Sequence, residues 1–198
     1  MIEATVFDYG VGNLHSLAKA LERSGARVRV ATDAAGIAGA ACLVLPGVGA
    51  AGRVMEQLTP AADALRRKLE SGVPALGVCV GMQVMYGESE EGAARCLGYF
   101  GGGVRRLRAP ILPHIGWSPV AHAGDPLFEG IPAGESFYFV HSFAAAAAGA
   151  IATAEYGEPF AAASRRGNVW GVQFHPEKSS RAGLAVLANF VRLAEQLA

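Results

Sequence analysis

The order of strand-like and helix-like segments is the feature that most restricts how this chain can fold. Apolar runs rich in β-branched residues alternate with helical patterns until about residue 97. The strand-like runs are TVFDYG, RVRVA, ACLVLPG and PALGVCVGMQ, and the helical ones include LHSLAKALERSG and ADALRRKLESG. Strands that alternate with helices usually pair in parallel, because each helix carries the chain back across one face of the sheet. The order therefore predicts an α/β fold with a parallel sheet.

Two helices have recognisable boundaries. The first is predicted to start after Asn13, a capping residue type, and to end at Gly25. Its apolar positions, spaced i, i+3, i+4 and i+7, are Leu14, Leu17, Ala18 and Leu21. The last helix is predicted to run from about Arg181 to Leu197. Its buried stripe is expected to consist of Leu184, Leu187, Val191 and Ala194, widened by Val186, Phe190 and Leu193.

The second half of the chain has a different pattern of residues. Glycine-rich or alternating segments, such as GYFGGGVRRL, SFYFVHSF and NVWGVQF, indicate antiparallel strands added to the parallel core. No repeat or flexible linker divides the 198 residues. The predicted fold class is thus a single α/β domain over residues 1–198, with an open, mainly parallel twisted sheet flanked by helices and additional antiparallel strands.

Composition excludes several kinds of partner. The chain carries 17 basic and 17 acidic residues, so no excess charge attracts nucleic acid or an anionic membrane. No apolar run approaches the roughly 20 residues that span a bilayer, and the N-terminus has no signal-like core, which favours a cytoplasmic protein. The three cysteines lack CxxC spacing, so neither a disulfide framework nor a metal site is suggested. We expect a small neutral ligand or a protein partner, and no cofactor.

One cysteine lies where an apolar strand turns into a helical pattern. Cys79 has Gly77 before it and Gly81 after it, which gives the spacing G-x-C-x-G. In G-x-S-x-G hydrolases this design lifts the nucleophile above the sheet edge, so we expect Cys79 to be exposed and the Val80 N–H to stabilise an oxyanion. The helix start beside the sulfur favours the thiolate. Alone, the pattern also fits an ordinary buried core cysteine.

A histidine and a glutamate stand two residues apart near the other end of the chain. His175 and Glu177 follow an apolar strand, and alternate residues of an extended segment face the same side. Pro176 is expected to hold the segment extended. A lone His-x-Glu pair is usually a coincidence of surface residues. Together with Cys79 it makes a nucleophile, a base and an orienting carboxylate at the ends of parallel strands, where ligands bind.

A third segment, LVLPGVGAAG, also follows an apolar strand. It exposes the backbone N–H groups of Gly47, Val48 and Gly49, and these could complete an oxyanion hole opposite Val80. A Pro-Gly pair after a strand is equally well explained as an efficient turn.

These residues resemble the class I, triad-type glutamine amidotransferases, and among them the glutaminase subunits of imidazole glycerol phosphate synthase. The resemblance runs almost end to end. The segments that carry it are DYGVGNLHS (8–16), LPGVGA (45–50), GVCVGMQ (77–83), ESEEG (88–92), PHIGW (113–117), YFVHSF (138–143) and GVQFHPEKS (171–179). The cysteine and HPE segments recur across amidotransferases, whereas the first segment, PHIGW and YFVHS are more particular to the histidine-pathway subunit. The resemblance implies a flavodoxin-like fold, a glutamyl thioester on Cys79, and ammonia delivered through a tunnel to a (β/α)8-barrel cyclase subunit in a heterodimer.

The resemblance also implies which residues hold glutamine. Gln83 and Glu91 match substrate-holding positions, and Glu91 suits the α-ammonium group. Gly49, Ser142 and Phe143 match positions that contact glutamine mainly through the main chain.

By resemblance, Trp117, Tyr138 and Lys178 are expected near the cyclase, although each could be a core aromatic residue or a solvated lysine. Three positions depart from the family pattern, all outside the triad. They are Val80 in place of leucine, Ser118 in place of asparagine and Ala51 in place of phenylalanine.

Three alternatives remain open at this stage. A dinucleotide-binding domain would explain G-x-G after the first strand and Asp33 further on, but His15 occupies the position of the third glycine. A different hydrolase with an elbow cysteine, or an inactive relative that only binds, is the second alternative, but an inert binding module would have no need to retain Cys79, His175 and Glu177 with the PGVG loop. Glutaminases of other biosynthetic pathways share the chemistry, and composition does not separate them.

Overall fold

The core of the protein is an eight-stranded mixed sheet whose first five strands are parallel. The computed structural model describes residues 1–10 and 14–197. The parallel strands, in spatial order, are β2 (Arg27–Ala31), β1 (Glu3–Phe7), β3 (Cys42–Leu45), β4 (Ala75–Val78) and β14 (Val169–Val172). The order 2-1-3-4, completed by a strand from far along the chain, is that of flavodoxin-like folds. The predicted α/β class with a mainly parallel open sheet is confirmed.

Further strands of the described residues extend this sheet and form two smaller ones. The extension consists of β13 (Glu158–Arg166), β12 (Ala152–Tyr156) and β9 (Ala121–His122). One small sheet pairs β8 (His114–Pro119) with β10 (Ser136–His141). The other contains β11 (Phe143–Ala145), β7 (Gly103–Arg106), β5 (Glu88–Ser89) and β6 (Ala94–Arg95). Antiparallel strands are therefore present after residue 97, as predicted, whereas β5 and β6 precede that point and β5 pairs with β7 in parallel.

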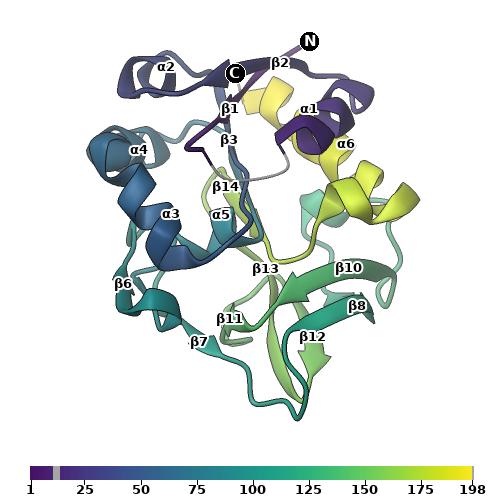
Figure 1. The fold of residues 1–198 in the computed structure, drawn as a ribbon. Helices are drawn as coiled ribbons and strands as arrows, with labels where there is room; N and C mark the ends of the chain where they lie inside the picture. Colours follow the sequence, from purple (N-terminus) through teal and green to yellow (C-terminus); the bar gives the residue numbers. More distant parts are fainter. Residues whose placement is uncertain (11–13, 198) are drawn as a thin grey trace.

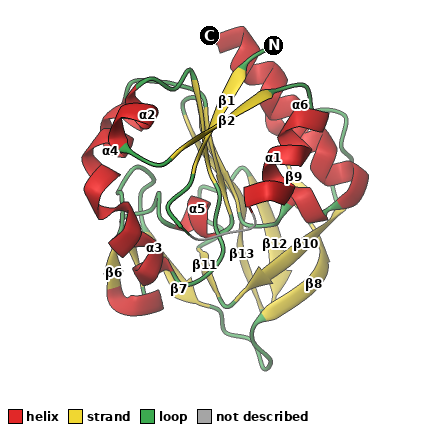
Figure 2. Ribbon diagram, turned by 45° about the horizontal axis from the view of Figure 1, so that its top comes forward, coloured by secondary structure: helices red, strands yellow, loops and turns green. Residues whose placement is uncertain are grey.

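Helices cover both faces of the parallel strands. Figure 1 and Figure 2 show α1 (Leu14–Arg23) and α6 (Ser180–Leu197) on one face, and α2 (Ala34–Ala38), α3 (Ala51–Leu58) and α4 (Ala62–Glu70) on the other. The four-residue helix α5 (Val80–Gln83) follows β4 directly. Within residues 1–10 and 14–197 there are also four short 3-10 turns, namely η1 (Thr59–Ala61), η2 (Glu91–Ala93), η3 (Pro126–Phe128) and η4 (Pro176–Lys178). None of the described helices combines the length and apolar character that crossing a membrane requires.

The first predicted helix is largely confirmed. Helix α1 ends at Arg23, and Gly25 adopts a φ of +97°, the left-handed conformation that closes many helices. The predicted Asn13 cap and the G-x-G motif fall on or across residues 11–13, outside the described part of the chain. Asp33, the acidic residue of the dinucleotide alternative, accepts a hydrogen bond from the Gly36 N–H (2.8 Å) and caps α2. That contact gives Asp33 a structural role.

The last helix is also present, but its buried stripe lies slightly to one side of the predicted one. The fully buried positions of α6 are Gly183, Val186, Leu187, Phe190, Val191 and Ala194. Leu184 and Leu193 are only partly buried. Gly183 belongs to the buried side, where its backbone lies against Pro176 so closely that a side chain would overlap the Pro176 carbonyl.

Aromatic residues pack the two-stranded sheet of β8 and β10, called here the β8–β10 ribbon, against the rest of the core. Along β10 the inward positions Phe137, Phe139 and His141 alternate with half-buried ones. The Phe137 ring stacks on Phe174 with 4.2 Å between ring centroids. Phe174 immediately precedes His175, so this packing fixes β10 beside the end of β14.

Candidate active site

Cys79 lies at a sharp turn between strand β4 and helix α5. Its φ of +52° is unusual for a residue with a side chain, and its N–H donates to the Val172 carbonyl at 2.7 Å. A side chain on Gly77 would come within 2.7 Å of the Gly81 carbonyl oxygen, so the flanking glycines permit the close approach of strand and helix. The predicted elbow is therefore present.

The prediction that Cys79 is exposed is wrong. Its exposed fraction is only 3%, because the loop after β3 and the strand β10 cover the turn. Cys42 and Cys96 are also buried, and burial raises the pKa of the Cys42 thiol to about 12 and that of Cys96 to about 11. Unlike these two, Cys79 lines a cavity.

His175 and Glu177 are paired, although not by the geometry that strand alternation predicts. His175 is extended, but Pro176 begins the 3-10 turn η4. Proline restricts the preceding residue to extended conformations while its own φ suits the first position of a helical turn. The turn brings Glu177 Oε1 to 2.9 Å from His175 Nδ1, and both side chains are almost fully buried. The expectation that Pro176 holds the segment extended is wrong, yet the predicted pair forms.

The environment of His175 favours its protonated form. Burial by itself would lower the pKa, but hydrogen bonds to Cys79 and Glu177 and the charges of the same two groups outweigh it and raise the pKa to about 9. At neutral pH this imidazole can therefore hold a proton beside the sulfur. A raised pKa stabilises the fold fully below about pH 6.5, and that contribution is lost as the pH rises towards 9.

A cavity of about 140 Å³ joins the predicted site residues. This is smaller than the roughly 300–1,000 Å³ of drug-sized pockets, and suits a ligand no larger than an amino acid. The residues that line it are Val48, Gly49, Cys79, Val80, Gln83, Glu91, Val140, His141, Ser142, Phe143, His175 and Lys178. The predicted catalytic, oxyanion and glutamine-binding residues lie on this wall, except Gly47, which does not line the cavity, and Glu177, which stands behind His175.

The loop after β3 faces the nucleophile. A side chain on Gly47 would come within 2.8 Å of the Val80 carbonyl carbon, so this loop packs directly on the start of α5. Gly49 adopts a φ of +99°, which residues with a side chain rarely tolerate. Val80 occupies the first position of α5, where a helix N–H has no intrahelical acceptor. Residues from two elements, Val80 of α5 and Val48 and Gly49 of the loop, thus line the cavity together with Cys79.

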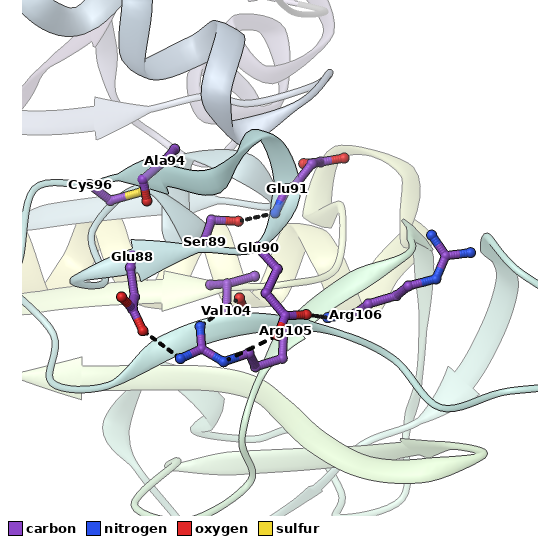
Figure 3. Close-up of polar contacts among 9 residues, drawn as sticks. All are labelled: Glu88, Ser89, Glu90, Glu91, Ala94, Cys96, Val104, Arg105 and Arg106. Atoms are coloured by element: carbon purple, nitrogen blue, oxygen red, sulfur yellow. Dashed lines mark hydrogen bonds and ion pairs between the residues drawn. The ribbon is translucent and has the colours of Figure 1, made fainter.

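The segment that carries Glu91 is held in place by its neighbours. Figure 3 shows Glu88 and Glu90 turned towards Arg105 of β7, with which both form ion pairs. The Glu91 side chain extends away from that cluster, and its Oε2 accepts a hydrogen bond from the Ala51 N–H (2.8 Å) at the start of α3. Of the three glutamates, Glu91 is the one that lines the cavity, as the sequence predicts.

Three buried polar residues of the site have no role in the sequence-based prediction. Gln173 donates from Nε2 to Cys79 Sγ at 3.5 Å. His141 lines the cavity, and His114 contacts it through a hydrogen bond of 3.1 Å between Nδ1 of His114 and Nε2 of His141. The alternation in SFYFVHSF could have placed His141 on the inward face of its strand, but no sequence pattern pairs it with His114.

The donors and acceptors of the two histidines can be assigned from one carbonyl. The Phe143 carbonyl oxygen only accepts, so His141 Nδ1 must donate to it (3.0 Å). In a neutral ring His141 Nε2 then accepts from His114, whose Nε2 in turn accepts from the Ser118 hydroxyl at 2.9 Å. Ser118 stands where the family pattern has asparagine. Its hydroxyl thus donates the hydrogen bond at the far end of this series. In these tautomers protonation of His141 would set its Nε2–H against the Nδ1–H of His114, whereas the Ser118 hydroxyl can rotate to accept from a protonated His114.

We predict that this histidine pair limits stability in acid. Burial lowers the pKa of His114, and burial together with the charges of His114 and His175 lowers that of His141 to about 4. Above pH 6.5 both rings are neutral whether the chain is folded or not. Below it the unfolded chain gains protons first, so the free energy of unfolding should fall by about 2 kcal/mol by pH 5 for His141 alone.

Urea denaturation at pH 7, 6 and 5 measures this loss. His141→Asn keeps an N–H donor near Phe143 but has no titrating ring, so it should be less stable at pH 7 and lose less between pH 7 and 5. An equal acid loss in both proteins would contradict the assignment.

The outer face of the β8–β10 ribbon carries exposed apolar side chains beside the cavity. Trp117 is 52% exposed and its ring meets Tyr138 edge to face at 5.9 Å between centroids. Ile115, 59% exposed, pairs in register with the cavity residue Val140. Lys178 is exposed at the cavity rim. Lys178 lines the cavity, whereas Trp117 and Ile115 do not, and Trp117 is not a core aromatic residue.

Comparisons with known proteins agree with this geometry. Residues 5–194 match the family described as glutamine amidotransferase class-I. The chain is 45% identical to a protein of Herpetosiphon aurantiacus, with 96% of this chain and 93% of the relative covered. It is 46% identical to a protein of Moorella thermoacetica, with 95% and 93% covered. Both relatives are named imidazole glycerol phosphate synthase subunit HisH.

Solved structures share the fold at lower identity. A putative GMP synthase subunit from Thermoplasma acidophilum superposes with a TM-score of 0.76 at 18% identity, with 99% of this chain and 95% of that chain covered. A structure described as a glutamine amidotransferase gives the same TM-score at 19% identity, with 98% and 100% covered. The elbow cysteine, the buried histidine–glutamate pair and these matches lead to one conclusion: the chain belongs to the class I glutamine amidotransferase family.

Proposed function

We propose that this chain is the glutaminase subunit of imidazole glycerol phosphate synthase. The observation that carries the chemical part is the cavity, where Cys79, His175 and Glu91 meet within a space suited to one amino acid. The pathway rests on the names of relatives that are about 45% identical over nearly the whole chain. The product, ammonia, would serve a cyclase that makes imidazole glycerol phosphate.

In this proposal Cys79 is the nucleophile and His175 moves the protons. The Cys79 sulfur attacks the side-chain amide carbon of glutamine, and the C–N bond breaks as His175 protonates the departing nitrogen. The products of this half-reaction are ammonia and a glutamyl thioester. Water, deprotonated by His175, then attacks the thioester carbon and releases glutamate and the thiol. Glu177 orients the ring through its 2.9 Å contact with Nδ1.

Backbone groups on both sides of the sulfur would stabilise the tetrahedral oxyanion. The N–H of Val80 lies on the helix side, and Val48 and Gly49 lie on the loop side. Glu91 would bind the α-ammonium of glutamine, because its carboxylate lines the cavity. Gln83, Ser142 and Phe143 border the same space and would contact the rest of the substrate.

The partner would be a (β/α)8-barrel cyclase in the cytoplasm. It would dock on the face formed by Trp117, Tyr138 and Lys178, because exposed aromatic side chains beside a catalytic cavity are typical of interface cores. Docking there would place the partner over the mouth, where ammonia leaves. Glutaminases of other pathways share the chemistry, so the partner distinguishes them.

Glutamate release from glutamine, measured with and without a purified cyclase, tests the proposal. We expect slow release by the chain alone and faster release in the presence of the cyclase with its bound ligand. No glutamate under either condition would refute the enzymatic proposal. Stimulation only by the synthetase partner of another pathway would refute the assignment to histidine biosynthesis.

We predict that Gly49→Ala lowers the glutaminase rate about a hundredfold, the typical cost of one lost oxyanion donor. No atom lies within 4 Å of a side chain added there, so the effect comes from the φ of +99°, which alanine resists by shifting the loop. Gly25→Ala is the matched control, since Gly25 has a φ of +97° and equally open surroundings at the end of α1. Equal activity losses in both variants would show that general destabilisation, and not the loop, is responsible.

A further inference from the structure

Gln173 is a fully buried residue whose side chain contacts both Cys79, the proposed nucleophile, and Gln83, a proposed glutamine-binding residue. Its exposed fraction is 0%, and its backbone N–H donates to the Ala162 carbonyl at 2.8 Å. Its amide Nε2 lies 3.5 Å from Cys79 Sγ, and its Oε1 lies 3.0 Å from Gln83 Nε2. Both ends of this amide therefore have partners in the active site.

The orientation of the Gln173 amide follows from the Phe143 carbonyl. That oxygen can only accept, so the group of Gln83 that faces it at 2.8 Å must be the NH₂. The same NH₂ lies against Gln173, which must present its carbonyl oxygen to it, since two amino groups would repel each other. The remaining end of Gln173, its NH₂, then faces the Cys79 sulfur.

The surroundings leave this arrangement little freedom. The Phe143 carbonyl also accepts from His141, so it is anchored on a second side. Gln83 lines the cavity and its Oε1 has no hydrogen-bond partner among the described residues, so its amide is held through the two contacts of its Nε2. A buried amide that loses one partner is left with an unsatisfied polar group, which is destabilising, so each contact reinforces the next.

We propose that Gln173 is a positioning residue of the glutaminase site: its amide N–H stabilises and aims the Cys79 thiolate, and its carbonyl fixes the amide of Gln83. A hydrogen bond to the charged form of an acid favours that form, so the N–H increases the fraction of the attacking thiolate, which outweighs the smaller loss of nucleophilicity of each thiolate. Gln173 acts through Cys79 and Gln83. The catalytic role of those two rests on the proposed function, whereas the N–H to sulfur contact does not.

The test is the rate at which iodoacetamide alkylates Cys79, followed from pH 5 to 10 by mass spectrometry of the Cys79 peptide. Gln173→Met has a similar length but no amide. We expect it to react about threefold more slowly than the parent at pH 7, with its pH profile moved upward, because the loss of thiolate is partly offset by the higher nucleophilicity of a thiolate without the hydrogen bond. With the cyclase present, kcat for glutamine should fall by a similar factor while KM changes less.

Ser164→Ala is the matched control. It removes the buried Tyr86–Ser164 hydrogen bond (2.6 Å) on β13, next to β14, without contacting Cys79. It should lower thermal stability and leave the alkylation profile where it is. Gln173→Asn keeps an amide but is one methylene too short for the sulfur, so it serves if the methionine variant does not fold, with the same upward shift expected.

An alkylation profile that stays unchanged in a folded Gln173 variant would overturn the proposal. A shift as large in Ser164→Ala would also overturn it, because general loosening would then explain the effect. Alkylation does not depend on glutamine, so a parent protein that releases no glutamate would refute the proposed function while the alkylation profiles still decide the role of Gln173.

Discussion

Cys79→Ala is expected to abolish glutamine-dependent formation of imidazole glycerol phosphate in the complex with the cyclase, while ammonia-dependent formation continues at the parental rate. Without the sulfur no thioester can form, and loss of a catalytic nucleophile costs about a millionfold in rate. Alanine fits the site, because Cys79 makes its strongest contact, the 2.7 Å hydrogen bond to Val172, through the backbone. Parallel assays with glutamine and with ammonium chloride measure the two activities.

Cys96→Ala is the control for this experiment. Cys96 is a second buried cysteine, but it does not line the cavity, so its replacement should leave both activities in place. If Cys79→Ala removed the ammonia-dependent activity as well, the proposed division of labour between the two subunits would be wrong. Retention of glutamine-dependent turnover would rule out Cys79 as the nucleophile.

The fold could be read from the sequence because its main elements carry local patterns. Alternating strand-like and helical segments indicated the parallel core, and the glycines around Cys79 indicated the turn at the end of β4. The burial of Cys79 could not be read in this way. It depends on the loop after β3 and on strand β10, which contact the turn only in the folded chain.

Local patterns were also insufficient for the contact between His175 and Glu177. The i, i+2 spacing identified the right residues for the wrong reason, since the pair forms across a 3-10 turn. A proline favours both an extended residue before it and a turn after it, and the sequence does not show which effect dominates. The packing of α6 against Pro176 through Gly183 fixes the turn, and that contact is tertiary.

Residues that act through long-range hydrogen bonds had no sequence pattern to reveal them. Gln173 stands between recognised residues of the same motif, yet its partners, Cys79 and Gln83, lie 94 and 90 positions away in the chain. The His114–His141 pair similarly joins two strands that lie next to each other only in the folded ribbon. Such contacts emerge from the register of strands, which single-sequence patterns do not determine.

Glu177→Gln is expected to lower the glutaminase rate about ten-thousandfold while leaving the cavity intact. The side chain has the same shape, but the amide can offer an N–H to His175 Nδ1 and so place the imidazole proton on the wrong nitrogen, an effect of this size in a related triad. Among the described residues, Glu177 Oε2 has no hydrogen-bond partner, so the carboxylate acts mainly through the 2.9 Å contact of Oε1 with His175. Stopped assays of glutamate release with the cyclase present measure the rate.

Two further measurements separate an effect on the ring from a loss of structure. The carboxylate helps to raise the pKa of His175 to about 9, so in Glu177→Gln the ring should titrate at a lower pH, which NMR of the imidazole protons detects. The thermal stability of Glu177→Gln should fall furthest below that of the parent at pH values under 6.5. The stabilisation that the raised pKa of His175 supplies to the parent is fully present there. The control Glu195→Gln removes a carboxylate that pairs with the N-terminus on the surface, so it should change neither the rate nor the titration. A Glu177→Gln variant with near-parental turnover would mean that His175 is oriented by its sulfur contact alone, and that the third member of the triad is dispensable.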